Sequence, residues 1–316
     1  MLFSRKWIYL FGVFTFISCS SSKSEKTISH INEDVVTIAI LGDQGTGIHA
    51  QNILSLVKSQ GADLLLINGD FDYEDEPKKW EKMHLDILGR DFPIIAVAGN
   101  HDVPKWSEYQ KIISRWEQNP KLTCTGEAGV MTDCMFEGIE IVSVTPDIFE
   151  NQKPNISQTY IKETFEKSNA IWRISQWHKA MRDMQTGDKG DSTGWGVYEE
   201  SRKQGAMIVT GHEHAYSRSY LLSDFPNKIV DSNSSTMQLE KGKTFMALSG
   251  LGGRSSRPKR HEGYWWAAEE NADTGAEAGV LFCTYRVDNN PKKASCYFMD
   301  EYKKVLDTFT LINNLK

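Results

Sequence analysis

Polar residues recur directly after apolar, strand-like runs, and this pattern limits the possible folds more than any other feature of the chain. Asp43, Asp70, Asn100, His178 and His212 each lie at or just past the C-terminal end of such a run. The chemistry of α/β proteins gathers at the carboxyl ends of their strands. A single Asp or His in such a place is more often a cap or turn residue, but five at successive strand ends predict one shared site.

The elements around these residues follow the alternation typical of an α/β protein. Apolar runs that indicate buried strands cover 35–41, 62–67, 92–98, 139–144, 171–177, 206–210 and 244–248. Apolar residues have helical spacing at 48–59, after Pro77 and at 106–117.

The last part of the chain has a different pattern. Residues 281–311 are predicted to form a meander of three short strands, and 249–279, rich in Gly, Arg and Trp, a long loop over the site. No repeat, heptad pattern or linker interrupts the chain after residue 34, which favours one domain over residues 35–316.

The N-terminus has the pattern of an export signal. Arg5 and Lys6 precede an apolar run over 7–17, which is too short to span a bilayer as a mature helix. The sequence FISC then resembles the lipobox of bacterial lipoproteins, whose cysteine is lipidated. We therefore predict a lipoprotein-type signal peptide over 1–18, lipidation of Cys19 and a flexible tether over 19–34. A plain signal peptide with an incidental cysteine is the alternative.

The remaining cysteines suit an exported protein. Cys124, Cys134, Cys283 and Cys296 are even in number and lack the spacing of a zinc cluster. Of the three possible connectivities we favour 124–134 with 283–296, because each pair brackets a turn-like segment and would staple a local hairpin. The net charge of −6 comes without any block of basic residues, which argues against nucleic acid as a partner.

The motifs at the strand ends resemble a known family. They read GDQG at 42–45, GDFDY at 69–73, GNHD at 99–102, WH at 177–178 and GHEH at 211–214. A lone GD or GNH is common, but all of them in this order resemble the calcineurin-like metallophosphoesterases. Gly45 stands two residues after Asp43, where most of that family has a metal-binding His. Tyr73 compensates for it, as in the purple acid phosphatase branch.

This resemblance implies a fold, a metal pair and a ligand set. The fold would be a four-layer α/β/β/α sandwich with two mixed sheets. One metal would be held by Asp43, Asp70, Tyr73 and His214, and the other by Asp70, Asn100, His178 and His212. Carboxylate and phenolate oxygens suit Fe(III), whereas His and amide oxygen suit a softer Fe(II), Zn(II) or Mn(II).

The resemblance also implies roles for residues that bind no metal. His101 would donate a proton to the leaving group, and Asp102 would orient its imidazole. Arg254 follows a Gly-rich turn and is a candidate for binding the substrate phosphate.

The sequence thus predicts an acid phosphatase-like enzyme that hydrolyses small or exposed phosphomonoesters by direct attack of metal-bound hydroxide. One alternative is a phosphodiesterase or nucleotidase that uses the same site. Another is a surface-binding lipoprotein without catalysis. We expect a lipid anchor in the outer membrane or facing the periplasm, and the oligomeric state stays open.

Overall fold

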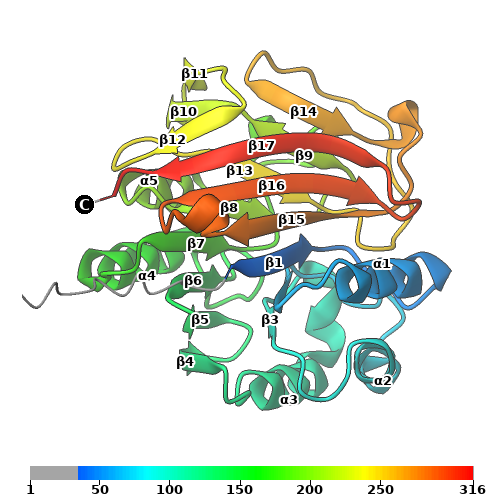
Figure 1. Cartoon of the computed structure of the whole chain (residues 1–316). Coiled ribbons are helices and arrows are strands. Elements are labelled where there is room, and N and C mark those ends of the chain that lie inside the picture. Colours follow the sequence, from blue (N-terminus) through cyan, green and yellow to red (C-terminus); the bar gives the residue numbers. More distant parts are fainter. Residues whose placement is uncertain (1–34, 316) are drawn as a thin grey trace, which may run out of the picture. The chain divides into compact units, whose positions relative to one another are not determined.

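Two β-sheets packed face to face form the centre of the molecule (Figure 1). The computed structural model describes residues 35–315, so the predicted signal peptide, the tether and the lipidation site Cys19 lie outside the described residues. Within 35–315, no helix is both long enough and apolar enough to cross a membrane.

The first sheet has the strand order β12-β17-β16-β15-β1-β2-β3. Its strands are β1 (Val36–Leu41), β2 (Leu64–Ile67), β3 (Ile94–Ala96), β12 (Thr236–Leu239), β15 (Gly279–Tyr285), β16 (Lys293–Asp300) and β17 (Val305–Asn313). Strands β1, β2 and β3 are parallel, whereas β1 pairs with β15 in antiparallel orientation. The sheet is therefore mixed.

The second sheet has the order β14-β9-β13-β8-β7-β6-β5-β4. Its strands are β4 (Leu122–Glu127), β5 (Met131–Phe136), β6 (Ile139–Val144), β7 (Trp172–Gln176), β8 (Met207–Thr210), β9 (Tyr216–Ser219), β13 (Met246–Ser249) and β14 (Trp266–Glu270). Here β6, β7, β8 and β13 run parallel, and the strands at both edges are antiparallel. A separate hairpin consists of β10 (Leu221–Asp224) and β11 (Ile229–Ser232).

Helices cover the outer face of each sheet. These are α1 (Ile48–Ser59), α2 (Pro77–Ile87), α3 (Trp106–Trp116), α4 (Pro154–Lys167) and α5 (Trp195–Lys203). Helices α1, α2 and α3 share a hydrophobic cluster with the first sheet, and α4 and α5 share one with the second. The predicted four-layer α/β/β/α sandwich with two mixed sheets is confirmed.

The alternation of side chains along β1 explains why it lies in the middle of these layers. Ile38 and Ile40 point between the two sheets, and Ala39 and Leu41 point toward the helices. Because both faces are buried, the strand is a continuous apolar run instead of an alternating one. Truncating Ile38 to alanine would cost about 2–5 kcal/mol of unfolding free energy, as is usual for core positions of this size.

Both favoured disulfides are confirmed, and each joins residues directly opposite each other on neighbouring strands. Cys124 pairs with Cys134 across β4 and β5, and Cys283 with Cys296 across β15 and β16. Each bond therefore staples a hairpin.

Two predictions about the C-terminal region need correction. The meander has three strands, but they hold 7, 8 and 9 residues and are not short. The segment 249–279 is not a continuous loop, because it contains β14, which pairs with β9 at the edge of the second sheet. Arg254 and Ser255, which contact Tyr73 and His214, both precede β14.

Candidate metal centre

The C-terminal ends of strands from both sheets meet at one place. Strands β1, β2 and β3 deliver Asp43, Asp70 and Asn100 from the first sheet, and β7 and β8 deliver His178 and His212 from the second. The Asn68 side-chain amide donates to the Thr210 carbonyl at 3.0 Å, which joins the ends of β2 and β8. The predicted site therefore lies where the two sheets adjoin.

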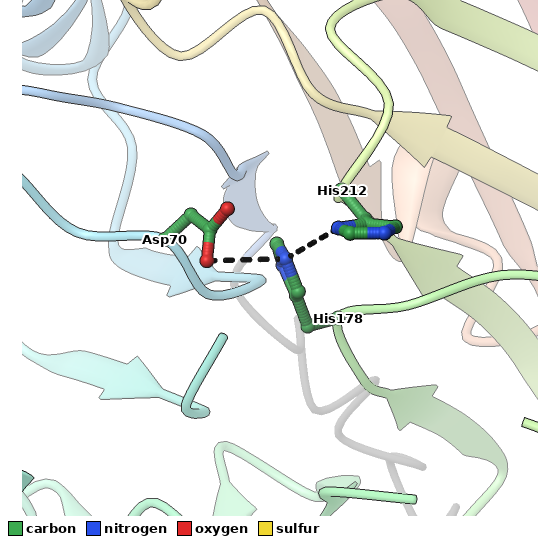
Figure 2. Close-up of side chains that lie close together, drawn as sticks. All are labelled: Asp70, His178 and His212. Carbon is green, nitrogen blue, oxygen red and sulfur yellow. Dashed lines mark hydrogen bonds and ion pairs between the residues drawn. The ribbon is translucent and has the colours of Figure 1, made fainter. Parts of the chain in front are cut away.

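Asp70, His178 and His212 form one compact group of donor atoms (Figure 2). His178 Nε2 lies 3.2 Å from Asp70 Oδ1 and 3.2 Å from His212 Nδ1. The other ring nitrogen of His178, Nδ1, donates to the Asn68 carbonyl at 2.6 Å. Its Nε2 lone pair therefore faces a carboxylate oxygen and a second imidazole nitrogen, an arrangement that suits a shared cation.

Asp43, Tyr73 and His214 form a second group. The Tyr73 hydroxyl donates to Asp43 Oδ1 at 3.0 Å and lies 3.0 Å from His214 Nε2, which is 3.5 Å from the same Asp43 oxygen. His214 Nδ1 donates to the Ser255 carbonyl at 2.9 Å, so Nε2 is left with its lone pair toward the group. Carboxylate, phenol and imidazole here converge from three different loops.

The two groups are tied together through the backbone. Asp43 Oδ2 accepts the backbone N–H of His212 at 2.7 Å. Asn100 follows β3, and its side-chain oxygen is buried without a hydrogen-bond partner among the described residues. A buried amide oxygen of this kind carries an unsatisfied acceptor. It fits the predicted role of a metal ligand.

Backbone strain is also concentrated at the site. Asp43, Asp70, Tyr73 and His212 have φ of 57°, 54°, 62° and 73°, in the left-handed region that non-glycine residues rarely adopt. Such residues persist only where the surrounding structure holds them, and they gather at functional sites. Gly99 allows the approach of the loops, because a Cβ there would lie 2.2 Å from Asp70 Oδ1.

The charges of the site favour cation binding. Burial, reinforced by the charge of Asp70 and opposed by His178, raises the pKa of Asp43 to about 7. Burial and then the charge of Arg257 lower the pKa of His214 to about 3, and burial also lowers the pKa of His212 far below its usual value. His178 differs, because Asp70 raises its pKa against the effect of burial, so in this structure the His178 ring takes the place of a cation beside Asp70. Neutral imidazoles are the form that binds metals, and buried carboxylates need a cation to stay ionised. The donor set therefore fits metal ions.

His101 lies beside these groups and does not belong to them. Its exposed ring is 4.7 Å from the Tyr73 ring, measured between centroids, and its backbone N–H donates to Asp70 Oδ1 at 2.9 Å. The imidazole is therefore free to face a bound substrate.

Asp102 has other partners than expected. Its carboxylate accepts the backbone N–H groups of Gly99, Asp70 and Phe71 at 2.7, 3.0 and 2.8 Å. The predicted hydrogen bond to the His101 imidazole is not among the bonds of residues 35–315, and this expectation is corrected. Three amide donors converge on one carboxylate because the loop after β3 folds back onto the loop after β2. Asp102 is thus placed to fix Asp70, not to orient His101.

Cationic side chains line the same region. The Arg254 guanidinium lies over the Tyr73 ring, 4.7 Å from its centroid, and the Arg254 backbone N–H donates to the Asp43 carbonyl at 3.0 Å. Three further cations that the sequence did not lead us to expect lie in two loops that meet next to His214, namely Lys189, Arg257 and Arg260. No local motif marks these residues, because only the fold brings the two loops together.

Comparisons with known proteins agree with this site. Residues 36–216, more than half of the chain, match the calcineurin-like phosphoesterase family, and this range contains every predicted metal ligand. A search of curated proteins found no match.

Solved structures share the fold at low sequence identity. The purple acid phosphatase PPD1 from yellow lupin (Lupinus luteus) seeds aligns with a TM-score of 0.66 and 12% identity, over 89% of this chain and 54% of the lupin chain. The present chain thus spans about half the length of that phosphatase. GAP50, the anchor in the inner membrane complex of Plasmodium, aligns with a TM-score of 0.61 and 11% identity over 89% of this chain and 91% of its own.

PhoD aligns with a TM-score of 0.57 and 10% identity, over 88% of this chain and 70% of its own. These likenesses concern the fold, and the sequence match to the family carries the assignment. The chain therefore belongs to the calcineurin-like phosphoesterase family and is a metal-dependent hydrolase of phosphate esters.

Proposed function

We propose that this hydrolase acts on phosphomonoesters by direct attack of water on phosphorus, in the manner of a purple acid phosphatase. The observation that supports it best is the convergence of two donor groups, Asp43–Tyr73–His214 and Asp70–His178–His212. In the reaction, the P–O bond to the leaving group breaks and a new P–O bond to the water oxygen forms. No Ser or Cys of the site is needed as a nucleophile.

Each donor group would hold one metal ion. Asp43, Tyr73 and His214 suit Fe(III), because carboxylate and phenolate are hard donors, and His178, His212 and Asn100 suit Fe(II), Zn(II) or Mn(II). Asp70 is proposed to bridge the two ions. When bound, such a pair lowers the pKa of a coordinated water and neutralises charge on the phosphoryl oxygens.

His101 and Arg254 would handle the substrate. His101 is exposed beside Tyr73, and we assign it the proton that the leaving alkoxide takes up as the ester bond breaks. Arg254 lies over the same tyrosine ring, where its guanidinium can donate to a phosphoryl oxygen. The two residues would then bind and protonate opposite parts of one ester.

Two other functions remain in competition with this one. A phosphodiesterase or nucleotidase would use the same donor groups, and the ratio of p-nitrophenyl phosphate to bis-p-nitrophenyl phosphate hydrolysis separates it from a monoesterase. The second alternative is a surface-binding lipoprotein without catalysis, and the fold is shared with GAP50, the anchor in the inner membrane complex of Plasmodium. Against it stands the complete donor set, since a relic would be expected to lose ligands.

We also propose that the enzyme is exported and attached to the outer membrane, or faces the periplasm, through a lipid on Cys19. This rests on the N-terminal sequence alone. Labelling of the full chain with a radioactive fatty acid, compared with Cys19→Ala, tests it. Equal labelling of both proteins would refute it.

The function is tested on residues 27–316 through metal content, visible absorption and turnover of p-nitrophenyl phosphate. We expect two metals including iron, and a tyrosinate-to-iron absorption band that disappears in Tyr73→Phe. Two metals with turnover but no such band would keep the hydrolase and remove Tyr73 from the iron. A protein that binds metal only sub-stoichiometrically and turns over neither ester would contradict the proposal.

A further inference from the structure

We infer that the substrate carries a second phosphoryl group, which binds Lys189 and Arg260 in a pocket beside the metal centre. This inference rests on the proposed phosphomonoester hydrolysis and narrows its substrate class. The pocket has a volume of about 330 Å³ and lies between the loop around Lys189 and the loop around Arg257.

One residue that lines the pocket, Glu213, is the chain neighbour of two proposed metal ligands. It stands between His212 and His214 in the chain, and the Arg257 backbone N–H donates to the His214 carbonyl at 2.9 Å. A substrate whose ester phosphate lies at the metal centre would therefore extend directly into this space.

Two cations of the pocket make no close ion pair with the described residues, although Asp43 and Glu213 attract the Lys189 ammonium at longer range. Of its carboxylates, Glu213 faces Arg257 at 3.6 Å and Asp188 faces Arg182 at 3.4 Å. Within residues 35–315, neither the Lys189 ammonium nor the Arg260 guanidinium has a carboxylate within 4.0 Å or donates a side-chain hydrogen bond. Uncommitted cations next to a metal site of a chain with net charge −6 indicate an anionic ligand.

The two loops are joined before any ligand binds. The backbone N–H groups of Arg260 and His261 both donate to the Thr186 carbonyl, at 2.7 and 3.0 Å. The Gln185 side-chain amide donates to the Lys189 carbonyl at 2.9 Å. A pocket held in this way pays little ordering entropy on binding.

The hydrogen-bond donors of Lys189 and Arg260 favour a phosphoryl group as the second anionic group of the substrate. A guanidinium matches the oxygens of a phosphate with two parallel hydrogen bonds, and an ammonium adds a point charge. The volume lies at the small end of ligand sites, so it suits a compact anion and not a polymer. The inferred substrate is therefore a small molecule with an ester phosphate and a second phosphoryl group a few bonds away.

The test compares two phosphonates that cannot be hydrolysed, propylphosphonate and propane-1,3-diphosphonate, by calorimetric titration of the metal-loaded protein. We expect the diphosphonate to bind at least about tenfold more tightly, as one additional charged hydrogen-bonded contact would provide. Lys189→Gln and Arg260→Gln should each weaken binding of the diphosphonate far more than binding of propylphosphonate, and so remove most of this preference. Arg90→Gln, an equal charge change at an exposed position after α2, is the matched control.

Equal binding of the two phosphonates would overturn the inference, as would a preference that survives in the Lys189→Gln/Arg260→Gln double variant, because the metals alone would then account for it. Turnover of p-nitrophenyl phosphate is measured on the same samples. If turnover is present without the preference, the inference fails and the proposed function stands. If the preference is present without turnover, the pocket is an anion site and the proposed function fails.

Discussion

Asp102 holds the backbone of Asp70, the residue proposed to be a ligand of both metal ions. Its two carboxylate oxygens accept three backbone N–H groups, from Gly99, Asp70 and Phe71. All three donors are in the interior, where the loss of a partner costs about 1–3 kcal/mol for each group. The side chain therefore acts on Asp70 through the main chain.

Replacing Asp102 with Asn tests this role. The amide nitrogen would meet backbone N–H donors, so we expect the free energy of unfolding to fall by about 2–4 kcal/mol. Metal content and turnover should fall with it, and all three quantities can be followed by denaturant titration, elemental analysis and p-nitrophenyl phosphate assays. A variant with normal stability and metal content but an altered pH profile of turnover would instead mean that Asp102 orients the His101 imidazole.

For His101 we expect the opposite outcome, in which turnover falls but metal content and stability do not. Because only its backbone N–H contacts Asp70, His101→Ala should keep both metals and the stability of the wild type. Turnover should fall by roughly 10²-fold or more for an alkyl phosphate and less for p-nitrophenyl phosphate, whose leaving group needs no proton. Kinetics on both esters and metal analysis of the same preparation provide the measurement. Loss of a metal would make His101 a ligand.

At the scale of elements, the loop over 185–190 packs closely against Glu213 because residue 187 is a glycine. A Cβ on Gly187 would lie 2.2 Å from the carboxyl carbon of Glu213, whereas one on Gly190 would meet nothing within 4 Å. Gly187→Ala must therefore displace the Glu213 carboxylate from Arg257 or lift the loop away from the pocket.

The pair Gly187→Ala and Gly190→Ala isolates this contact. We expect Gly187→Ala to weaken binding of propane-1,3-diphosphonate by roughly tenfold, about 1.4 kcal/mol, and Gly190→Ala to leave it unchanged. Propylphosphonate affinity should stay within a factor of about two in both variants. Equal behaviour of the two variants would mean that the loop tolerates the added methyl group by moving elsewhere.

For the whole molecule, the parts that sequence reasoning could predict are those with local causes. Strands β1 and β2 are buried on both faces, so each is a continuous apolar run, and the polar residue after it marks the strand end. Helix α4 was missed because only Ser157, Ile161 and Phe165 of its residues are buried, which gives too few apolar positions for a pattern.

Strand β9, with the sequence YSRS, was missed because its residues are buried although they are polar. Asp307 of β17, far along the chain, makes this possible, because it accepts from Arg218 Nε at 2.7 Å and from the Tyr216 hydroxyl at 2.7 Å. The pocket of Lys189 and Arg260 depends in the same way on two loops that only the fold brings together. Contacts between residues that are distant in sequence produce no periodic pattern, so they could not be predicted from the sequence.

The stability of the whole molecule should depend on pH through His84 of α2, which is not one of the predicted metal ligands. The ring is 1% exposed, lies against Trp80 and Trp116, and its Nε2 has no hydrogen-bond partner among the described residues. Burial lowers its pKa from 6.5 to about 4, with the hydrogen bond to the Trp80 carbonyl opposing the shift. Between these values the unfolded chain binds a proton at His84 that the native state does not.

Protonation of His84 therefore stabilises the unfolded state as the pH falls. The contribution of neutral His84 to the free energy of unfolding is complete above pH 6.5 and is lost progressively toward pH 4. At about pH 4.5 the loss amounts to roughly 2.5 kcal/mol. Denaturant unfolding of the wild type and His84→Gln at pH 7 and pH 4.5 measures it, because Gln keeps an amide donor for the Trp80 carbonyl and does not titrate. The difference between the two proteins should shift by this amount in favour of His84→Gln at the lower pH. An unchanged difference would mean that His84 is protonated in the native state, and that its ring has found a partner inside the core.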